Sequence, residues 1–174
     1  MSKITIISSS NRQDNQTIVF SSLCRKLLED QGVNAQLFSL QDLPLDLSGV
    51  GTYDYERGPL AGIVEKYLTG VDKLIFVVPE YNGSFPGILK LFIDAVRPAN
   101  FNGKKAAIIG ISSGRSGNIR GMDHLTGILN YVKVHVYGHK LPIAQIDGLI
   151  VEGDIKDEFT LNRISDQING FLEF

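Results

Sequence analysis

The chain has 174 residues, the length of one ordinary domain, and we therefore expect a single domain over residues 1–174. Apolar residues make up 43% of it and charged residues 21%, which is typical of a globular protein and excludes a disordered chain. The net charge is −2 and no basic run occurs, so the sequence shows no electrostatic footprint for nucleic acid or an anionic membrane. By elimination, we expect small molecules as partners.

Short apolar runs alternate with segments of helical periodicity from one end of the chain to the other. In chain order we predict a strand over 3–8, a helix containing 18–28, a strand over 34–38, a helix over 59–69, a strand over 73–78, a helix over 86–96, a strand over 106–111, a helix over 118–130, a strand over 132–136 and a closing helix marked by Leu161, Ile164, Ile168, Phe171 and Leu172. The stretch over 41–58 is long for a simple connection, and we expect it to be a functional loop.

This order of elements predicts the architecture. Parallel strands need crossover helices, and right-handed crossovers place helices on both faces of the sheet. We therefore expect a three-layer α/β/α sandwich around a five-stranded parallel sheet in the flavodoxin-like order 2-1-3-4-5. Residues 73–78, a nearly uninterrupted apolar run, suit its most buried strand. In such sheets, ligands bind beyond the carboxyl ends of the strands, near the first and third.

The first loop at that edge, residues 8–17, is dense in hydrogen-bond donors. Its hydroxyls, side-chain amides, Arg12 and the free N–H groups of the following helix suit a phosphate. A simple polar turn that caps the helix is the alternative interpretation. The loop has neither the glycine–lysine pattern of nucleotide triphosphate sites nor the three-glycine pattern of tight dinucleotide sites, so a phosphomonoester fits better.

The second and third loops, residues 79–87 and 112–118, follow the third and fourth predicted strands. In the second loop Tyr81 stands beside amide and hydroxyl groups on a stretch stiffened by proline and glycine, which suits a flat heteroaromatic ligand. The third loop is made of small polar residues that let the backbone approach a ligand closely. Each loop alone is also explained as an ordinary turn, but three such loops at one sheet edge indicate a binding site.

These loops resemble one family. Loop one is similar to the Gly-Ser-x-Arg-x-x-Ser-x-Asn segment of the NAD(P)H-dependent FMN reductases, a group that includes quinone, azo-dye and chromate reductases. Pro79-Glu80-Tyr81-Asn82, followed by Pro86-Gly87, Lys90, Ile93 and Asp94, resembles that family's Pro-Glu-Tyr-Asn signature and the helix behind it. The third loop, with Arg120, His124 and Leu125 after it, resembles the family's third motif.

The resemblance implies FMN as cofactor, NADPH or NADH as reductant and a small electron acceptor, with ping-pong kinetics and no catalytic triad. The implied cofactor-binding residues are Ser9, Ser10, Arg12, Asn15, Gln16, Thr17, Pro79, Glu80, Tyr81, Asn82, Gly83, Ser112, Ser113, Gly114 and Arg115. Arg115 and the third loop would donate hydrogen bonds to the pyrimidine edge of the flavin. Asn118 replaces a glycine of the family pattern, and we expect the turn to persist because asparagine tolerates left-handed backbone angles.

Two other functions stay open from the residues themselves: a flavodoxin-like electron carrier, and a flavin-free binding module. Glu80 is either a general base or a hydrogen-bond partner of its loop or of a neighbouring subunit. The histidines are scattered, with His135 and His139 at a strand end, so we expect no metal site.

The single cysteine and one apolar helix lead to two further predictions, one about burial and one about self-association. Cys24 lies among leucines of the first helix and is expected to be a packed hydrophobe, and a single cysteine suits a reducing cytoplasm. No apolar run is long enough for a membrane span or a visible export signal. The helix over 86–96 has little polar surface, which predicts self-association as a homodimer or homotetramer.

Overall fold

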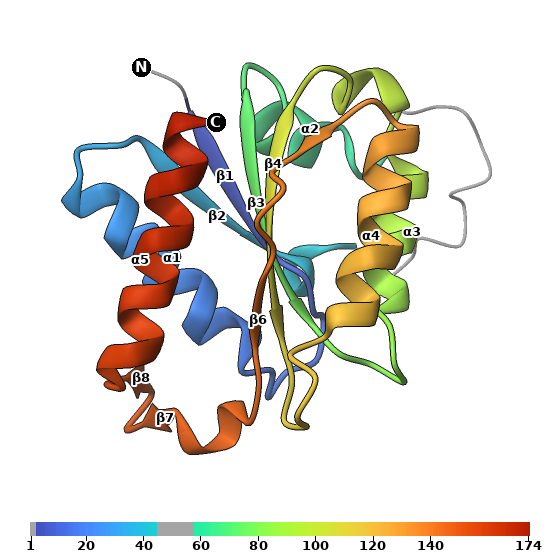
Figure 1. The fold of residues 1–174 in the computed structure, drawn as a ribbon. Coiled ribbons are helices and arrows are strands. Elements are labelled where there is room, and N and C mark those ends of the chain that lie inside the picture. The colour runs from blue at the N-terminus through green and yellow to red at the C-terminus, as the bar shows by residue number, and fades with distance from the viewer. Residues whose placement is uncertain (1–2, 45–57) are drawn as a thin grey trace.

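The computed structural model describes residues 3–44 and 58–174. A parallel sheet forms its centre, with α1 and α5 on one face and α2, α3 and α4 on the other (Figure 1). The helices are α1 (Thr17–Asp30), α2 (Ala61–Tyr67), α3 (Gly87–Ala95), α4 (Ile119–Tyr131) and α5 (Glu158–Glu173). This arrangement is the predicted three-layer α/β/α sandwich.

The strand order β2-β1-β3-β4-β5 is also the predicted one. The strands of this sheet are β1 (Ile4–Ser8), β2 (Ala35–Ser39), β3 (Lys73–Pro79), β4 (Lys105–Ile111), β5 (His135–Val136) and β6 (Leu141–Ile143), which pairs with β4. All of these pairings are parallel, so the carboxyl ends of the strands share one edge, at the bottom of Figure 1.

Both faces of the sheet are buried, and β3 shows why its sequence is apolar throughout. Phe76 and Val78 belong to the core beneath α2, α3 and α4, whereas Ile75 and Val77 belong to the core beneath α1 and α5. Successive side chains of a strand point to opposite faces, so a strand covered on both sides needs an apolar residue at every position. The prediction that this run is the most buried strand is consistent with its place at the middle of the sheet.

The predicted strand over 132–136 is wrong in its extent. Helix α4 continues to Tyr131, and the following turn places Lys133 at a φ of 63°, so β5 is reduced to His135–Val136. Val132 and Val134 are apolar because they are buried in the core, and a short apolar run does not distinguish burial from strand pairing.

A second short strand, β6, pairs with β4 on the same side as β5, after a break in the pairing. Between β5 and β6 the side chain of Gln167 on α5 replaces the missing ladder bonds: its Nε2 donates to the His139 carbonyl at 2.9 Å, and its Oε1 lies 2.6 Å from His139 Nδ1. The fifth position of the sheet is therefore shared by two short strands.

Two kinds of feature lie outside the predicted elements. Short 3-10 turns occur at η1 (Leu40–Asp42), η2 (Pro98–Asn100) and η3 (Ile146–Gly148). A hairpin of β7 (Ile150–Val151) and β8 (Asp154–Ile155) precedes α5. Most of the predicted functional loop over 41–58 falls on residues 45–57, outside the described part of the chain.

Cys24 is fully buried in the core between α1 and the sheet, as predicted. Burial raises the pKa of its thiol to about 12, so almost no thiolate forms near about pH 8. We expect the native protein to resist a thiol-specific colorimetric reagent at that pH, and the unfolded protein to react fully. Rapid labelling of the folded protein would contradict this burial.

Candidate functional site

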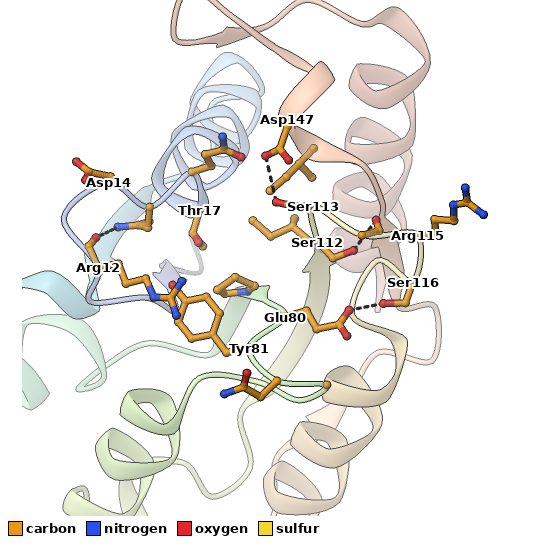
Figure 2. A pocket seen from close by; sticks show the side chains of 18 residues that line it. Arg12, Asp14, Thr17, Glu80, Tyr81, Ser112, Ser113, Arg115, Ser116 and Asp147 are labelled. Atoms are coloured by element: carbon orange, nitrogen blue, oxygen red, sulfur yellow. Dashed lines mark hydrogen bonds between the residues drawn. The ribbon is translucent and has the colours of Figure 1, made fainter.

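The loops that follow β1, β3 and β4 meet at the carboxyl edge of the sheet, as expected, and enclose a cavity of about 800 Å³ (Figure 2). This volume lies in the range of cofactor and small-molecule pockets, roughly 300–1,000 Å³. The predicted site residues that line it are Arg12, Asn15, Gln16, Thr17, Pro79, Glu80, Tyr81, Asn82, Gly83, Ser112, Ser113, Gly114 and Arg115. Ser9 and Ser10 do not line it; both are fully buried beneath loop one.

Loop one presents donors at the start of α1. Asn15 holds the loop in place: its Nδ2 donates to the Arg12 carbonyl at 2.5 Å, and its Oδ1 accepts from the Ile18 N–H at 3.2 Å. In the described part of the chain, the N–H groups of Gln16 and Thr17 have no acceptor. Because the helix dipole also favours negative charge there, this end of the cavity fits a phosphate.

Arg12 adds a full positive charge at the same end of the cavity. Its side chain is exposed, and within residues 3–44 and 58–174 no carboxylate lies within ion-pair distance of its guanidinium. Guanidinium N–H groups donate strong, charge-assisted bonds to phosphate oxygens. Loop one therefore combines a fixed cation with backbone donors, as the phosphate hypothesis requires.

Loop two is a stiff turn. Tyr81 and Ser84 exchange backbone hydrogen bonds of 2.9 and 3.1 Å around Asn82 and Gly83, whose φ angles are 53° and 77°. Two successive left-handed residues are what a tight type I′ turn requires, and Asn-Gly is its preferred sequence. A Cβ atom on Gly83 would meet only the flexible end of the Arg120 side chain, so the φ of 77°, which L side chains rarely adopt, is what favours glycine at this position.

Loop three is organised around Ser112. Its hydroxyl accepts from the Gly117 N–H at 2.9 Å and donates to the Gly114 carbonyl at 3.0 Å, which closes the loop. Asn118 adopts the left-handed conformation predicted for it, with φ 62° and ψ 32°. Its side-chain amide donates to the Val78 and Pro79 carbonyls at 3.0 and 3.1 Å, which ties the start of α4 to the end of β3.

Glu80 connects loops two and three. Its carboxylate accepts a hydrogen bond from the Ser116 hydroxyl, and its N–H donates to the Ile111 carbonyl at 2.9 Å. Of the two roles considered for Glu80, this geometry favours the structural one, because the carboxylate is engaged by the neighbouring loop.

A fourth segment, which the sequence did not predict as part of the site, also lines the cavity. Ile146 and Asp147 come from η3, just after β6, and Asp147 Oδ1 accepts from the Ser113 hydroxyl at 3.1 Å. Asp14, Ile111 and Ser116 also line the cavity without having been singled out. The strand-end rule would have pointed to η3 if the last parallel strand had been placed at β6 and not at 132–136.

Arg115 lies at the rim of the cavity, and its side chain is exposed and points away from the interior (Figure 2). The donor role expected for this guanidinium at a flavin edge therefore needs the side chain to turn inward. The rest of loop three needs no such movement.

The three loops lie in a segment of the chain that matches a known family. The family model described as NADPH-dependent FMN reductase matches residues 2–147, which contain all three loops. The chain belongs to this family.

The relatives extend the comparison. Over 98 residues the chain is 41% identical to an NAD(P)H-dependent FMN reductase of Pseudomonas aeruginosa, covering 52% of this chain and 53% of that protein. The chain thus spans about half the length of that relative. It is 34% identical over 130 residues to a 2-hydroxy-1,4-benzoquinone reductase of a Burkholderia species, covering 67% and 70%.

A solved structure also matches the FMN reductase fold seen here. The flavoenzyme NAD(P)H:(acceptor) oxidoreductase FerB of Paracoccus denitrificans superposes with a TM-score of 0.73 at 26% identity, over 99% of this chain and 96% of that one. The described residues contain no group of three or more His, Cys, Asp or Glu side chains that could hold a metal ion. None of the helices in that part of the chain combines the length and apolarity needed to cross a membrane.

Proposed function

We propose that the protein is an NAD(P)H-dependent reductase that binds FMN at the carboxyl edge of its sheet and reduces a small acceptor such as a quinone, an azo compound or a flavin. The observation that carries the proposal lies at one end of a cavity large enough for a cofactor, where Arg12 stands beside the Gln16 and Thr17 N–H groups, which have no acceptor within residues 3–44 and 58–174. Membership of the FMN reductase family supports it.

Each loop has its own part in holding FMN. Arg12, with the N–H groups of Gln16 and Thr17, would bind the phosphate, while residues 79–83 and 112–115 would line the ribityl chain and the ring. When bound, FMN would supply the redox chemistry, that is, the transfer of hydride from the nicotinamide and of electrons to the acceptor. No side chain of the protein needs to act as a nucleophile or base in this scheme.

The protein's own contribution is positioning. The Ser116–Glu80 bond and the Asn118 side chain keep loops two and three at a fixed separation, and the Asn82-Gly83 turn keeps one wall of the cavity stiff. A preformed cavity holds two flat reactants face to face and limits the entropy lost on binding. Because donor and acceptor would use the same open side of the cavity in turn, the kinetics should be ping-pong.

The test is spectroscopic and then kinetic. Purified protein mixed with FMN should retain it through gel filtration and absorb in the flavin bands, and it should oxidise NADPH or NADH steadily with a benzoquinone as acceptor. Parallel double-reciprocal plots at several acceptor concentrations would support the ping-pong order. FMN retention without NAD(P)H oxidation would favour the electron carrier, and protein that stays colourless with excess FMN would favour the flavin-free module.

A second copy of the chain is the partner that the surface favours. A groove of about 530 Å³ lies between α3 and α4, lined by residues that include Ile93, Ile128 and Tyr131, and Tyr131 is 88% exposed. Large aromatic side chains are enriched in protein interfaces. We expect light scattering to give the mass of a homodimer or homotetramer at every concentration above its dissociation constant, whereas a monomer mass throughout would rule the assembly out.

The cytoplasm is the proposed location. The only cysteine is buried and unpaired, so the fold needs no oxidising compartment.

A further inference from the structure

Tyr81 joins loop two to loop one through two side-chain contacts. Its hydroxyl lies 2.6 Å from the hydroxyl of Ser10, a side chain with no solvent exposure. The guanidinium carbon of Arg12 lies 3.8 Å from the centre of the Tyr81 ring (Figure 2). The ring is therefore fixed at its far end by one residue of loop one and covered by another.

The contacts around Arg12 show what the ring does. The backbone of Arg12 is held from two sides, since its carbonyl accepts from Asn15 Nδ2 at 2.5 Å and from Gln41 Nε2 at 2.8 Å. The side chain beyond that anchor is long and would otherwise sample many rotamers. Stacking on Tyr81 restricts it, while the N–H groups in the plane of the guanidinium stay free to donate to an anion.

We infer that Tyr81 is a positioning residue for the phosphate end of the cavity. Tyr81 holds Arg12 where a phosphate monoester binds, and the buried Ser10 hydroxyl holds Tyr81. This inference rests on the proposed function, and it adds to it a basis for selecting the phosphorylated flavin over its unphosphorylated counterpart. Loop two, which would otherwise serve the ring of the ligand, thereby also controls its phosphate.

The inference predicts a difference between two ligands that share one ring system. FMN and riboflavin are titrated against the wild type, Tyr81→Leu and Tyr81→Phe, with quenching of flavin fluorescence as the measure of binding. Tyr81→Leu removes the ring beneath Arg12 and should weaken FMN binding about 3- to 10-fold more than it weakens riboflavin binding, because any contact of Tyr81 with the ribityl chain or ring is common to both flavins. Tyr81→Phe keeps the ring but loses the Ser10 contact, so the difference between its effects on FMN and on riboflavin should be smaller. Equal losses for the two flavins would overturn the inference, as would an FMN affinity that Tyr81→Leu leaves unchanged.

A double-mutant cycle separates action through Arg12 from any other effect of the ring. If Tyr81 favours the phosphate only by placing Arg12, Tyr81→Leu should reduce the preference for FMN over riboflavin no further in an Arg12→Ala background. Additive losses of that preference would contradict the inference. Circular dichroism melting curves of each variant confirm that folded proteins are being compared.

A failure of the proposed function can be distinguished from a failure of the role inferred for Tyr81. If the wild type binds neither flavin, calorimetric titration of inorganic phosphate into the wild type and Tyr81→Leu still decides the matter. Weaker phosphate binding by Tyr81→Leu would sustain the role of Tyr81, and equal or absent binding would refute it. If both flavins bind and Tyr81→Leu weakens their binding equally, the proposed FMN binding is supported and the positioning role of Tyr81 is refuted.

Discussion

Replacing Arg12 with alanine should weaken FMN binding by about 1.5–3 kcal/mol, or about 10- to 150-fold in the dissociation constant. Arg12 is a charged donor at the end of the cavity where the Gln16 and Thr17 N–H groups find no acceptor among the described residues. Its guanidinium bonds to phosphate would be charge-assisted, which is why their loss is expected to exceed that of a neutral hydrogen bond. The measurement is a fluorescence titration of apoprotein with FMN at constant salt.

The chain offers a matched control for this variant. Arg25 lies on the exposed surface of α1, where it forms a 3.7 Å ion pair with Glu29 and does not line the cavity. Arg25→Ala should leave FMN affinity unchanged, and riboflavin should bind Arg12→Ala as well as it binds the wild type. If Arg12→Ala retained FMN with wild-type affinity, Arg12 would be removed from the phosphate site.

Replacing Gly110 with alanine should lower the free energy of unfolding by about 1–3 kcal/mol, the usual cost of overpacking a core. Gly110 lies in β4 directly beneath loop three, and an added Cβ atom would meet the Gly117 carbonyl oxygen and lie 2.8 Å from Met122 Sδ. One of these neighbours is backbone of loop three, so relief of the clash requires the loop to move. FMN affinity should therefore fall together with stability.

Urea unfolding followed by circular dichroism measures the effect of Gly110→Ala. Gly62→Ala is the matched control because Gly62 lies in α2 and, among the described residues beyond its own helix backbone and chain neighbours, has no atom within 4 Å of an added Cβ. In a helix, alanine is favoured over glycine by about 0.5–1 kcal/mol, so this variant should be at least as stable as the wild type. Wild-type stability of Gly110→Ala would show that β4 and loop three are less tightly packed than the structure indicates.

Local patterns predicted much of the site. Loops one, two and three could be located from strand ends, because apolar runs end where polar residues begin, and parallel strands bring those ends to one edge. The left-handed conformation of Asn118 was expected because asparagine, which tolerates such backbone angles, stands where the family pattern has a glycine. The missed residues Ile146 and Asp147 depended on the true last strand, β6, which an apolar run at 132–136 concealed.

The sequence by itself determined the alternation of strands and helices, the layered sheet, the edge that carries the site and the donor-rich chemistry of that edge. All of these follow from periodicity and residue type over short stretches of chain. Only the tertiary structure decided that Ser10 lies beneath the site and that Arg115 points away from the cavity. It also decided that Arg12 rests on Tyr81 and that Gln167 supports the break between β5 and β6. The physical reason is that such contacts join residues far apart in the chain, and their geometry is set by packing of the whole domain.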